Sequence, residues 1–144
     1  MKVKITRVDK TLPLPLYHTK GSVGCDLYAR ITMVIEPKKI AKIPANIIVG
    51  TPLGYMFMIA LRSSTPFKKG LIAPGGVGVG DADYCGPDDE YHISVYNCTD
   101  EDVTVEKGER IAQGIFVRVE KAEWEEVNII SKKSRGGFGS TGHK

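Results

Sequence analysis

Apolar and polar side chains alternate along most of this chain, and this period of two limits the folds open to it. The clearest run is YHISVY at residues 91–96, where Tyr91, Ile93 and Val95 fall on one side. Successive side chains point to opposite faces of a β-strand, whereas a helix repeats about every 3.6 residues. The alternation therefore predicts a fold made of strands, with the apolar side of each strand facing a core.

Further short segments carry the same pattern and are separated by turn residues. They are residues 3–5, 31–35, 47–49, 55–61, 103–105 and 110–119, the last being the longest. Pro37 follows the second of them, and a TPLG turn separates the third from the fourth. Many short strands at such spacing are typical of an all-β sandwich, barrel or jelly roll.

A single short helix is predicted directly after Arg62-Ser63-Ser64. Thr65 is expected to cap its N-terminus, Pro66 to take the first helical position, and Gly70 to end it. Free N–H groups at such a helix start, beside an arginine and two hydroxyls, suit a phosphate group. The same residues also fit a plain capped turn with a surface arginine, and this segment alone leaves both interpretations open.

Size, charge and cysteine content narrow the functional classes. A chain of 144 residues with 42% hydrophobic and 26% charged residues fits one globular domain. Its net charge of +3 is too small to indicate nucleic-acid binding, and its longest apolar run, residues 55–61, is of strand length and predicts no membrane span. Three cysteines without CxxC spacing argue against a disulfide framework or structural zinc, and favour a reducing cytoplasm.

Residues 75–84, GGVGVGDADY, combine closely spaced glycines with two carboxylates. Glycines weaken a strand unless something must approach its backbone, so a hairpin here is suited to grip a planar base through main-chain groups. Asp81 and Asp83 would point the same way if the strand continues, and a carboxylate beside a phosphate site can act as a general base or help a hydrated cation bind. The alternative is a solvated acidic loop, since three more acidic residues follow at 88–90.

Gln113 is a polar residue in an apolar row. Within residues 110–119 it has the parity of Ile111, Ile115 and Val117. It is therefore either a hydrogen-bonded core glutamine or a side chain turned into a pocket. No His/Asp or Cys/His arrangement in the sequence indicates a covalent nucleophile.

The C-terminal residues 131–144, SKKSRGGFGSTGHK, have no apolar periodicity and cannot form a core of their own. Their glycines let backbone N–H groups reach phosphate oxygens, Phe138 offers a stacking face, and Ser140 and Thr141 offer hydroxyls. This composition suits an arm that closes over an anionic ligand with a flat ring. A frayed, solvated tail is the alternative.

Taken in order, five segments resemble the motifs of the trimeric deoxyuridine triphosphatases, the dUTPases. They are residues 24–29 (GCDLYA), 61–64 (LRSS), 80–86 (GDADYCG), 108–113 (GERIAQ) and 135–142 (RGGFGSTG). The resemblance covers nearly the whole chain, from about residue 21 to residue 142. Any one motif is weakly specific, but all of them in order at family-like spacing are strongly specific.

The resemblance implies a jelly roll or distorted β-barrel with one short helix over residues 1–130, followed by a flexible C-terminal arm, residues 131–144. It implies hydrolysis of dUTP to dUMP and pyrophosphate by base-activated water attack on the α-phosphorus, assisted by Mg²⁺. That reaction limits uracil in DNA and supplies dUMP for thymidylate synthesis. It further implies a cytoplasmic homotrimer in which each site draws motifs from three subunits, with no nucleic-acid or membrane partner.

Roles for individual residues follow from the same resemblance. Asp81 would deprotonate the attacking water, Tyr84 would pack on the deoxyribose and exclude a 2′-hydroxyl, and Asp26 would reach Mg²⁺ through its water shell. Phe138 would stack on uracil, and either Arg135 or Lys133 would fill the arginine role of the fifth motif. The remaining substrate-binding residues would be Arg62, Ser63, Ser64, Gly75, Gly78, Gln113, Gly137, Ser140 and Thr141.

Several positions depart from the family pattern. Gly80 stands where a β-branched or large apolar residue is usual, and Cys25 stands where tyrosine is usual. Gly75 replaces an asparagine that often helps read uracil, so base recognition is expected to rest more on the backbone. Residues 87–89 resemble a small insertion.

Two rival functions remain at this stage. The related dCTP deaminases share the fold and the triphosphate cradle, but their chemistry needs a glutamate on the strand after the third motif, where this chain has Ser94. A non-catalytic trimer that binds nucleotide or a regulatory partner is the other. The presence of Asp81, Gln113 and Phe138 argues against it.

Overall fold

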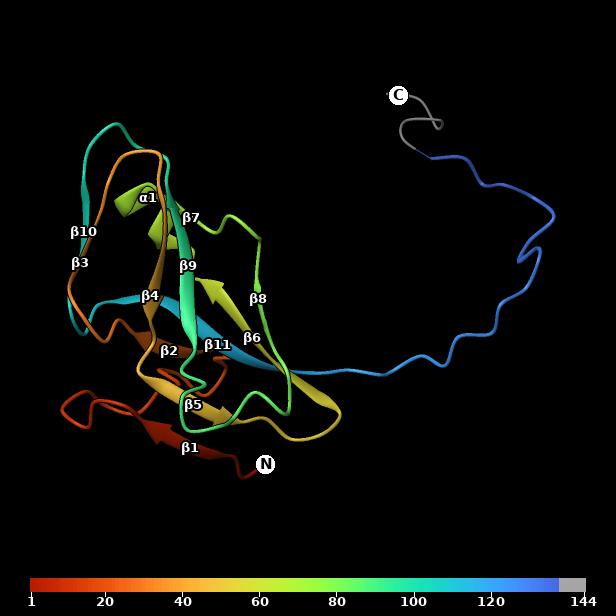
Figure 1. The fold of residues 1–144 in the computed structure, drawn as a ribbon, viewed down its shortest axis with the longest axis horizontal. Helices are drawn as coiled ribbons and strands as arrows, with labels where there is room; N and C mark the ends of the chain where they lie inside the picture. The colour runs from red at the N-terminus through yellow and green to blue at the C-terminus, as the bar shows by residue number, and fades with distance from the viewer. Residues whose placement is uncertain (138–144) are drawn as a thin grey trace.

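The computed structural model describes residues 1–137 of the chain, and nearly all of its regular structure is strand (Figure 1). In chain order the elements are β1 (Lys4–Arg7), β2 (Cys25–Tyr28), β3 (Met33–Ile35), β4 (Ile40–Pro44), β5 (Ile47–Gly50), β6 (Tyr55–Leu61), α1 (Ser64–Lys69), β7 (Leu71–Ile72), β8 (Gly78–Gly80), β9 (His92–Asn97), β10 (Val103–Val105) and β11 (Arg110–Arg118). The predicted all-β fold with one short helix is confirmed.

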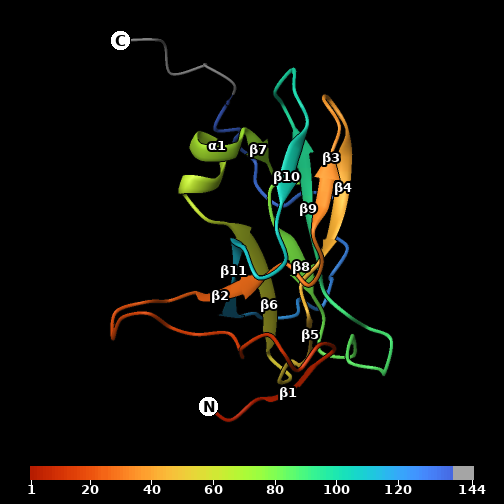
Figure 2. The same cartoon turned by 90° about the vertical axis from the view of Figure 1, so that its left-hand side faces the viewer.

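Antiparallel pairing organises these strands into sheets. A four-stranded sheet has the order β2-β11-β6-β8 and a three-stranded sheet the order β4-β9-β7, while β1 pairs with β5 and β10 with β3. In both ribbon views α1 lies at one end of the barrel beside β7, and β1 and β5 lie at the other end (Figures 1 and 2). β6 runs between the two ends, so its first and last residues face different surroundings.

The core is filled by the apolar sides of the alternating strands. Tyr91, Ile93 and Val95 are all buried, which confirms the face predicted from the period of two. Phe57 lies at the centre, with its ring centroid 5.0 Å from that of Phe116 and 5.2 Å from that of Tyr91. Its ring also lies where a Cβ at residue 114 would stand, so Gly114 is required for this packing.

The start of α1 differs from the prediction. The N-cap is Ser63, so Pro66 takes the third helical position, and the prediction of Thr65 as the cap is wrong. Thr65 is buried and its hydroxyl donates to the carbonyl of Ile111 at 2.8 Å. The hydroxyl therefore ties α1 to β11 instead of capping the helix. Gly70 ends the helix in the left-handed conformation (φ 62°), as predicted.

After β11 the chain leaves the barrel and extends away from it as irregular backbone (Figure 1). Residues 120–137 are exposed throughout, and Trp124 and Ile130 are 94% and 95% exposed. Apolar side chains of this size are unusual in full contact with water, so this segment has no packing partner within the described chain. No helix in residues 1–137 is long and apolar enough to cross a membrane.

Candidate functional site

A buried carboxylate gathers three basic side chains at one end of β6. Asp26 on β2 has only 8% of its side chain exposed, and its Oδ2 lies 3.1 Å from Arg110 Nη1 and 3.0 Å from His18 Nε2. Arg62, which follows β6, places its Nε 3.4 Å from Asp26 Oδ1. Two guanidinium groups against one carboxylate leave an excess positive charge, which suits an anion. We call these four residues the cation-rich end.

Strand register adds Gln113 to the same place. Gln113 on β11 is paired with Asp26 on β2 and with Ala60 on β6, so these side chains share one face of the sheet. A Cβ on Gly24 would stand 2.5 Å from Gln113 Oε1, so the amide lies against the glycine that opens the first motif. The half-buried amide is therefore turned toward the cation-rich end.

A β-bulge places Gln113 on a different face from Ile111, although the two residues have the same parity in the sequence. The register shifts between Arg110 and Ala112, and Ile111 and Ala112 are both buried as a result. An extra residue at a bulge reverses the facing of every later side chain. After the bulge, Ala112 and Gly114 face the core and Gln113 faces away from it.

A cavity of about 300 Å³ adjoins the cation-rich end and is lined by Arg62, Ser64, Lys68, Lys69 and Arg110, among others. Ser63 is exposed and makes no capping hydrogen bond through its side chain. Lys69 is engaged elsewhere, with its Nζ 2.9 Å from Glu109 Oε1. The arginines, Lys68 and the serine hydroxyls are thus the groups that present donors to a ligand in this cavity.

The third motif forms a tight turn at the other end of β6. β8 ends at Gly80, and the Tyr84 N–H donates to the Asp81 carbonyl at 3.3 Å. The strand does not continue through Asp83, so the condition for Asp81 and Asp83 to share one strand face is not met. Asp81 is exposed, and Tyr84 is held by a hydroxyl bond of 3.1 Å to the Glu90 carbonyl. We call Gly80, Asp81 and Tyr84 the third-motif end.

Asp81 and Tyr84 line a cavity of about 290 Å³ together with Lys42, His92 and Ser94. A neighbouring cavity of about 200 Å³ is lined by the glycine-rich loop, including Gly75 and Gly78, and also reaches His92 and Ser94. The structure therefore brings the predicted base-reading glycines next to Asp81 and Tyr84. No sequence motif points to Lys42 or His92, because it is the pairing of β4 with β9 that places them here.

The two ends are separated along β6. Gly80 pairs with Phe57, and Arg62 lies five residues further on, so an extended strand of about 3.4 Å per residue puts them about 17 Å apart. Among the described residues, the cavity at Arg62 and the cavity at Asp81 share no residue. One copy of residues 1–137 thus presents two separate parts of a site.

The remaining predicted residues lie in the C-terminal segment. Arg135 and Gly137 are exposed, and they belong to the segment after β11 that leaves the barrel (Figure 1). Phe138, Ser140 and Thr141 lie outside the described residues. The contacts predicted for these residues are therefore not made within residues 1–137.

Cys25 and the carboxylates limit the chemistry available. Burial raises the pKa of the Cys25 thiol, so it stays protonated and is a poor nucleophile or ligand. Within residues 1–137, no three His, Cys, Asp or Glu side chains are grouped so that they could hold a metal ion. Glu109 lines the cavity at Arg62 and is paired with Lys69, while Asp26 lies beside that cavity with both of its oxygens facing basic groups.

Comparison with known sequences identifies relatives along the whole chain. The dUTPase family model matches residues 10–142. The deoxyuridine 5′-triphosphate nucleotidohydrolase of Orientia tsutsugamushi (strain Ikeda) is 39% identical over 151 residues, covering 100% of both chains. The protein of the same name from Anaplasma marginale (strain St. Maries) is 38% identical over 148 residues, covering 99% of each.

Solved structures agree. The dUTPase from Streptococcus mutans has a TM-score of 0.78 at 29% identity, covering 86% of this chain and 100% of that one. The Staphylococcus bacteriophage 80alpha dUTPase with dUPNHPP has a TM-score of 0.85 at 26% identity, covering 98% of each. A mutant dUTPase from phage phi11 of S. aureus, described with a structural Mg(II) ion, shares the fold with a TM-score of 0.80 at 20% identity, covering 90% of this chain and 99% of that one.

Proposed function

The chain belongs to the dUTPase family and is a dUTP diphosphatase, and from that premise we propose how its own residues divide the reaction. Asp81 is the general base: it takes a proton from the water that attacks the α-phosphorus in line. The observation that carries this role is an exposed carboxylate at the rim of a cavity that it shares with Tyr84. The chain offers no activated nucleophile, so the displacement is a single step.

The cation-rich end receives the phosphates. Arg62, the hydroxyls of Ser63 and Ser64, and the Gln113 amide stabilise the charge that develops on the leaving pyrophosphate. Asp26 holds the arginine side chains in place while leaving a net positive charge beside the cavity. Because Asp26 holds Arg62 before the substrate arrives, this arginine needs little reorganisation in the transition state.

The third-motif end and the glycine-rich loop select the nucleoside. Tyr84 packs on the deoxyribose and rejects a 2′-hydroxyl by steric exclusion. Backbone groups near Gly75 and Gly78 read the uracil edge. Phe138 stacks on the base, and the arm of residues 131–144, distinct from the domain of residues 1–130, closes over the phosphates through Gly137, Ser140, Thr141 and either Arg135 or Lys133.

Magnesium fits this chain only as a companion of the nucleotide. The described residues provide no cage, and direct coordination by Asp26 would displace its arginines. Mg²⁺ usually keeps several waters and binds through one or two carboxylates plus substrate phosphates. Asp26 would therefore hold a water of the Mg²⁺–dUTP complex, and Mg²⁺ would supply charge neutralisation at the leaving pyrophosphate.

A homotrimer with shared sites accounts for two further observations. The two ends of β6 are too far apart to reach one α-phosphate from within a single chain, and a C₃ arrangement brings different copies of them together. The exposed Trp124 and Ile130 lie on a segment that leads away from its own barrel and so is free to cover a neighbouring copy. We place this trimer in the cytoplasm, without a nucleic-acid or membrane partner.

Product analysis separates this function from deamination. The protein is incubated with dUTP or dCTP, and pyrophosphate and ammonia are measured in parallel. We expect pyrophosphate from dUTP and no ammonia from dCTP, because Ser94 stands in the Asp81 cavity where deamination would need a carboxylate. Ammonia from dCTP at a rate comparable to dUTP cleavage would overturn the assignment.

A further inference from the structure

A buried hydroxyl lies directly behind the third-motif end. Tyr91, the residue before β9, is only 5% exposed, and its Oη has no hydrogen-bond partner among the described residues. The Thr51 hydroxyl, which likewise lacks a well-formed hydrogen bond, is its neighbour. Burial raises the pKa of Tyr91, an effect that the Thr51 hydroxyl opposes, and the phenol stays neutral at physiological pH. A buried phenol without a well-formed hydrogen bond costs stability.

The Tyr91 ring occupies the space that a side chain at position 80 would need. A Cβ built on Gly80 meets Tyr91 Oη and lies 2.5 Å from Cε1 and 2.7 Å from Cζ. These distances are well inside van der Waals contact, and the ring is packed on its other side by Phe57, at a centroid distance of 5.2 Å. Gly80 and Tyr91 are therefore a matched pair, which explains why this chain departs from an apolar residue at position 80.

The same ring supports Tyr84. The centroids of Tyr84 and Tyr91 are 5.2 Å apart at an interplanar angle of 68°, an edge-to-face contact. On its other side the Tyr84 hydroxyl donates to the Glu90 carbonyl at 3.1 Å. Two successive residues, Glu90 and Tyr91, thus hold the side chain to which we assign sugar selection.

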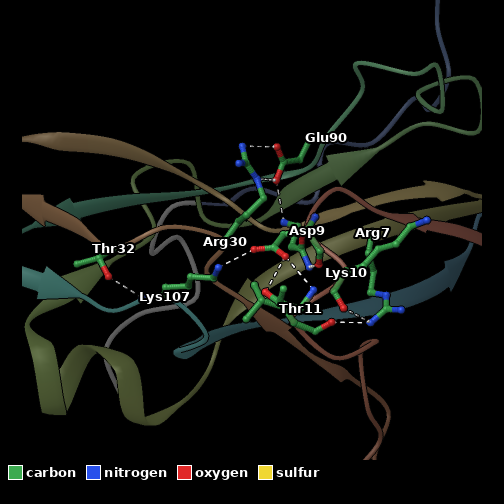
Figure 3. Close-up of polar contacts among 10 residues, drawn as sticks. Arg7, Asp9, Lys10, Thr11, Arg30, Thr32, Glu90 and Lys107 are labelled. Atoms are coloured by element: carbon green, nitrogen blue, oxygen red, sulfur yellow. Dashed lines mark hydrogen bonds and ion pairs between the residues drawn. The ribbon is translucent and has the colours of Figure 1, made fainter.

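Glu90 anchors this support to the rest of the barrel. Its carboxylate accepts two hydrogen bonds from Arg30, at 2.8 and 2.9 Å, and a third from the Asn46 N–H at 2.9 Å (Figure 3). A bidentate arginine bond fixes both distance and orientation. The backbone at Glu90 and Tyr91 therefore has little freedom to follow a displaced Tyr84.

We propose that Tyr91 is a positioning residue for the third-motif end. Its ring orients Tyr84 against the sugar. Its hydroxyl end limits how closely the backbone of Gly80 and Asp81 can approach the core, and so determines the position of the general base. Tyr91 lies at the back of the cavity that Asp81 and Tyr84 share and is only 5% exposed, so it acts through these two residues. This inference rests on the proposed function of Tyr84 and Asp81. It adds a residue whose substitution should change both the selectivity for dUTP over UTP and the rate of dUTP hydrolysis.

Selectivity between dUTP and UTP is the decisive measurement. Tyr91→Leu removes the edge contact, and we expect the ratio of kcat/KM for dUTP to that for UTP to fall about two- to tenfold, the range that such a contact supports. Val95→Ala is the matched control: Val95 is fully buried on the same strand face and lines neither cavity at the third-motif end, so the substitution lowers the melting temperature but leaves the ratio unchanged. An unchanged ratio in Tyr91→Leu, with Tyr84→Ala lowering it, would overturn the positioning role.

A mutant cycle of Gly80 and Tyr91 tests their contact independently of sugar selectivity. Gly80→Ala alone forces its Cβ against the Tyr91 ring, and we expect kcat for dUTP to fall about tenfold or more because Asp81 is displaced. Adding Tyr91→Leu opens the space, so the double variant should be more active than Gly80→Ala alone. Additive losses would overturn the inference. Equal kcat/KM for dUTP and UTP in the wild type would instead refute the sugar role of Tyr84, which distinguishes that failure from this one.

Discussion

The two ends of β6 are built by different physical means. At the cation-rich end, side chains from β2, β11, the segment after β6 and the N-terminal loop meet through charge: Asp26 lies within 3.4 Å of Arg62 and within 3.1 Å of Arg110. At the third-motif end, one short segment is held mainly by shape, through the Tyr84–Tyr91 edge contact and the missing Cβ of Gly80. The first arrangement suits a ligand with several negative charges, and the second suits an uncharged ring that must fit closely.

This difference explains why a single copy presents both parts without completing a site. Charge at the cation-rich end acts over several ångströms, but a general base must stand within hydrogen-bond reach of its water. A separation of about 17 Å along β6 leaves Asp81 far outside that reach for a phosphate bound at Arg62 of the same chain. Substitutions at the two ends should therefore have different effects on the kinetics of dUTP hydrolysis.

The largest effect is expected at the third-motif end. Asp81→Asn keeps the shape of the turn but removes the base, so kcat for dUTP should fall about 10²–10⁴-fold. Binding of a non-hydrolysable dUTP analogue should stay within about threefold of wild type, because the phosphate contacts lie at the other end. Calorimetric titration and steady-state kinetics measure the two quantities. A kcat near that of the wild type would exclude Asp81 as the base.

Removal of the C-terminal arm tests whether the two ends of β6 are sufficient for activity without it. We expect a chain ending at residue 130 to lose most of its activity, because Phe138 and the fifth-motif hydroxyls would be absent. Its melting temperature should change little, since residues 120–137 bury nothing in their own barrel. Differential scanning calorimetry at equal protein concentration checks this. A drop of many degrees would mean that the arm is a packed structural element.

A smaller effect, and one of a different kind, is expected at the cation-rich end. Arg62→Ala removes a phosphate donor, and loss of one charge-assisted contact typically costs about 1.5–3 kcal/mol, or roughly 10- to 100-fold in kcat/KM for dUTP. The loss should weaken at high salt, because screening already reduces the attraction in the wild type. Lys38→Ala is a suitable control, since Lys38 pairs with the exposed Asp100 away from either end. Salt-independent loss would argue against an electrostatic role.

The smallest effect is expected outside both ends, at Asp9. Its hydrogen bond to Lys107, followed by those to Thr11, holds the pKa of Asp9 well below its ordinary value of 3.8 (Figure 3). A lowered pKa in the folded state stabilises the protein above that ordinary value, and the contribution is lost as the pH falls below it. Asp9→Asn should therefore lower the melting temperature at pH 7 and do so less at pH 3, with dUTP turnover unchanged. An equal shift at both pH values would contradict this linkage.

The alternation of apolar and polar residues was sufficient to predict a strand where the pattern runs without interruption. Residues 55–61 were predicted as a strand and form β6 with the same bounds, because neither end is disturbed by a bulge or cap. For Gln113 alternation left a core position and a pocket position both open, because the bulge between Arg110 and Ala112 that decides its facing cannot be read from the sequence. The helix start was placed two residues late because the Thr65 hydroxyl bonds to β11, a tertiary contact that outweighs its capping preference.

The contacts within the site were likewise not predictable from the sequence alone. Motif resemblance named Asp26, Arg62 and Asp81, but did not indicate that the first two meet while the third stands apart. His18 meets Asp26 through the bridge between Leu16 and Asp26, and His92 reaches the Asp81 cavity at the start of β9; neither contact follows from the alternation of the sequence. Tyr91 was read as an ordinary core residue, since its relation to Gly80 depends on the register of β8 with β6 and on side-chain packing.

Subunit mixing tests most directly whether Asp81 and Arg62 of one working site come from different copies. Asp81→Asn chains and Arg62→Ala/Gln113→Ala chains are unfolded together, refolded in equal amounts, and assayed at low dUTP, where each parent alone is nearly inactive. Random mixing in a trimer gives each site a one-half chance of an intact Asp81 and an independent one-half chance of an intact phosphate end. About one quarter of the wild-type activity should therefore return.

A second mixture calibrates the first. Wild-type chains are combined in equal amounts with chains carrying Asp81→Asn, Arg62→Ala and Gln113→Ala together, and mass spectrometry verifies that mixed trimers have formed. Shared sites predict about one quarter of wild-type activity in this mixture as well. Sites built within one chain predict about one half here and none in the first mixture, and that pair of results would contradict a site shared between copies.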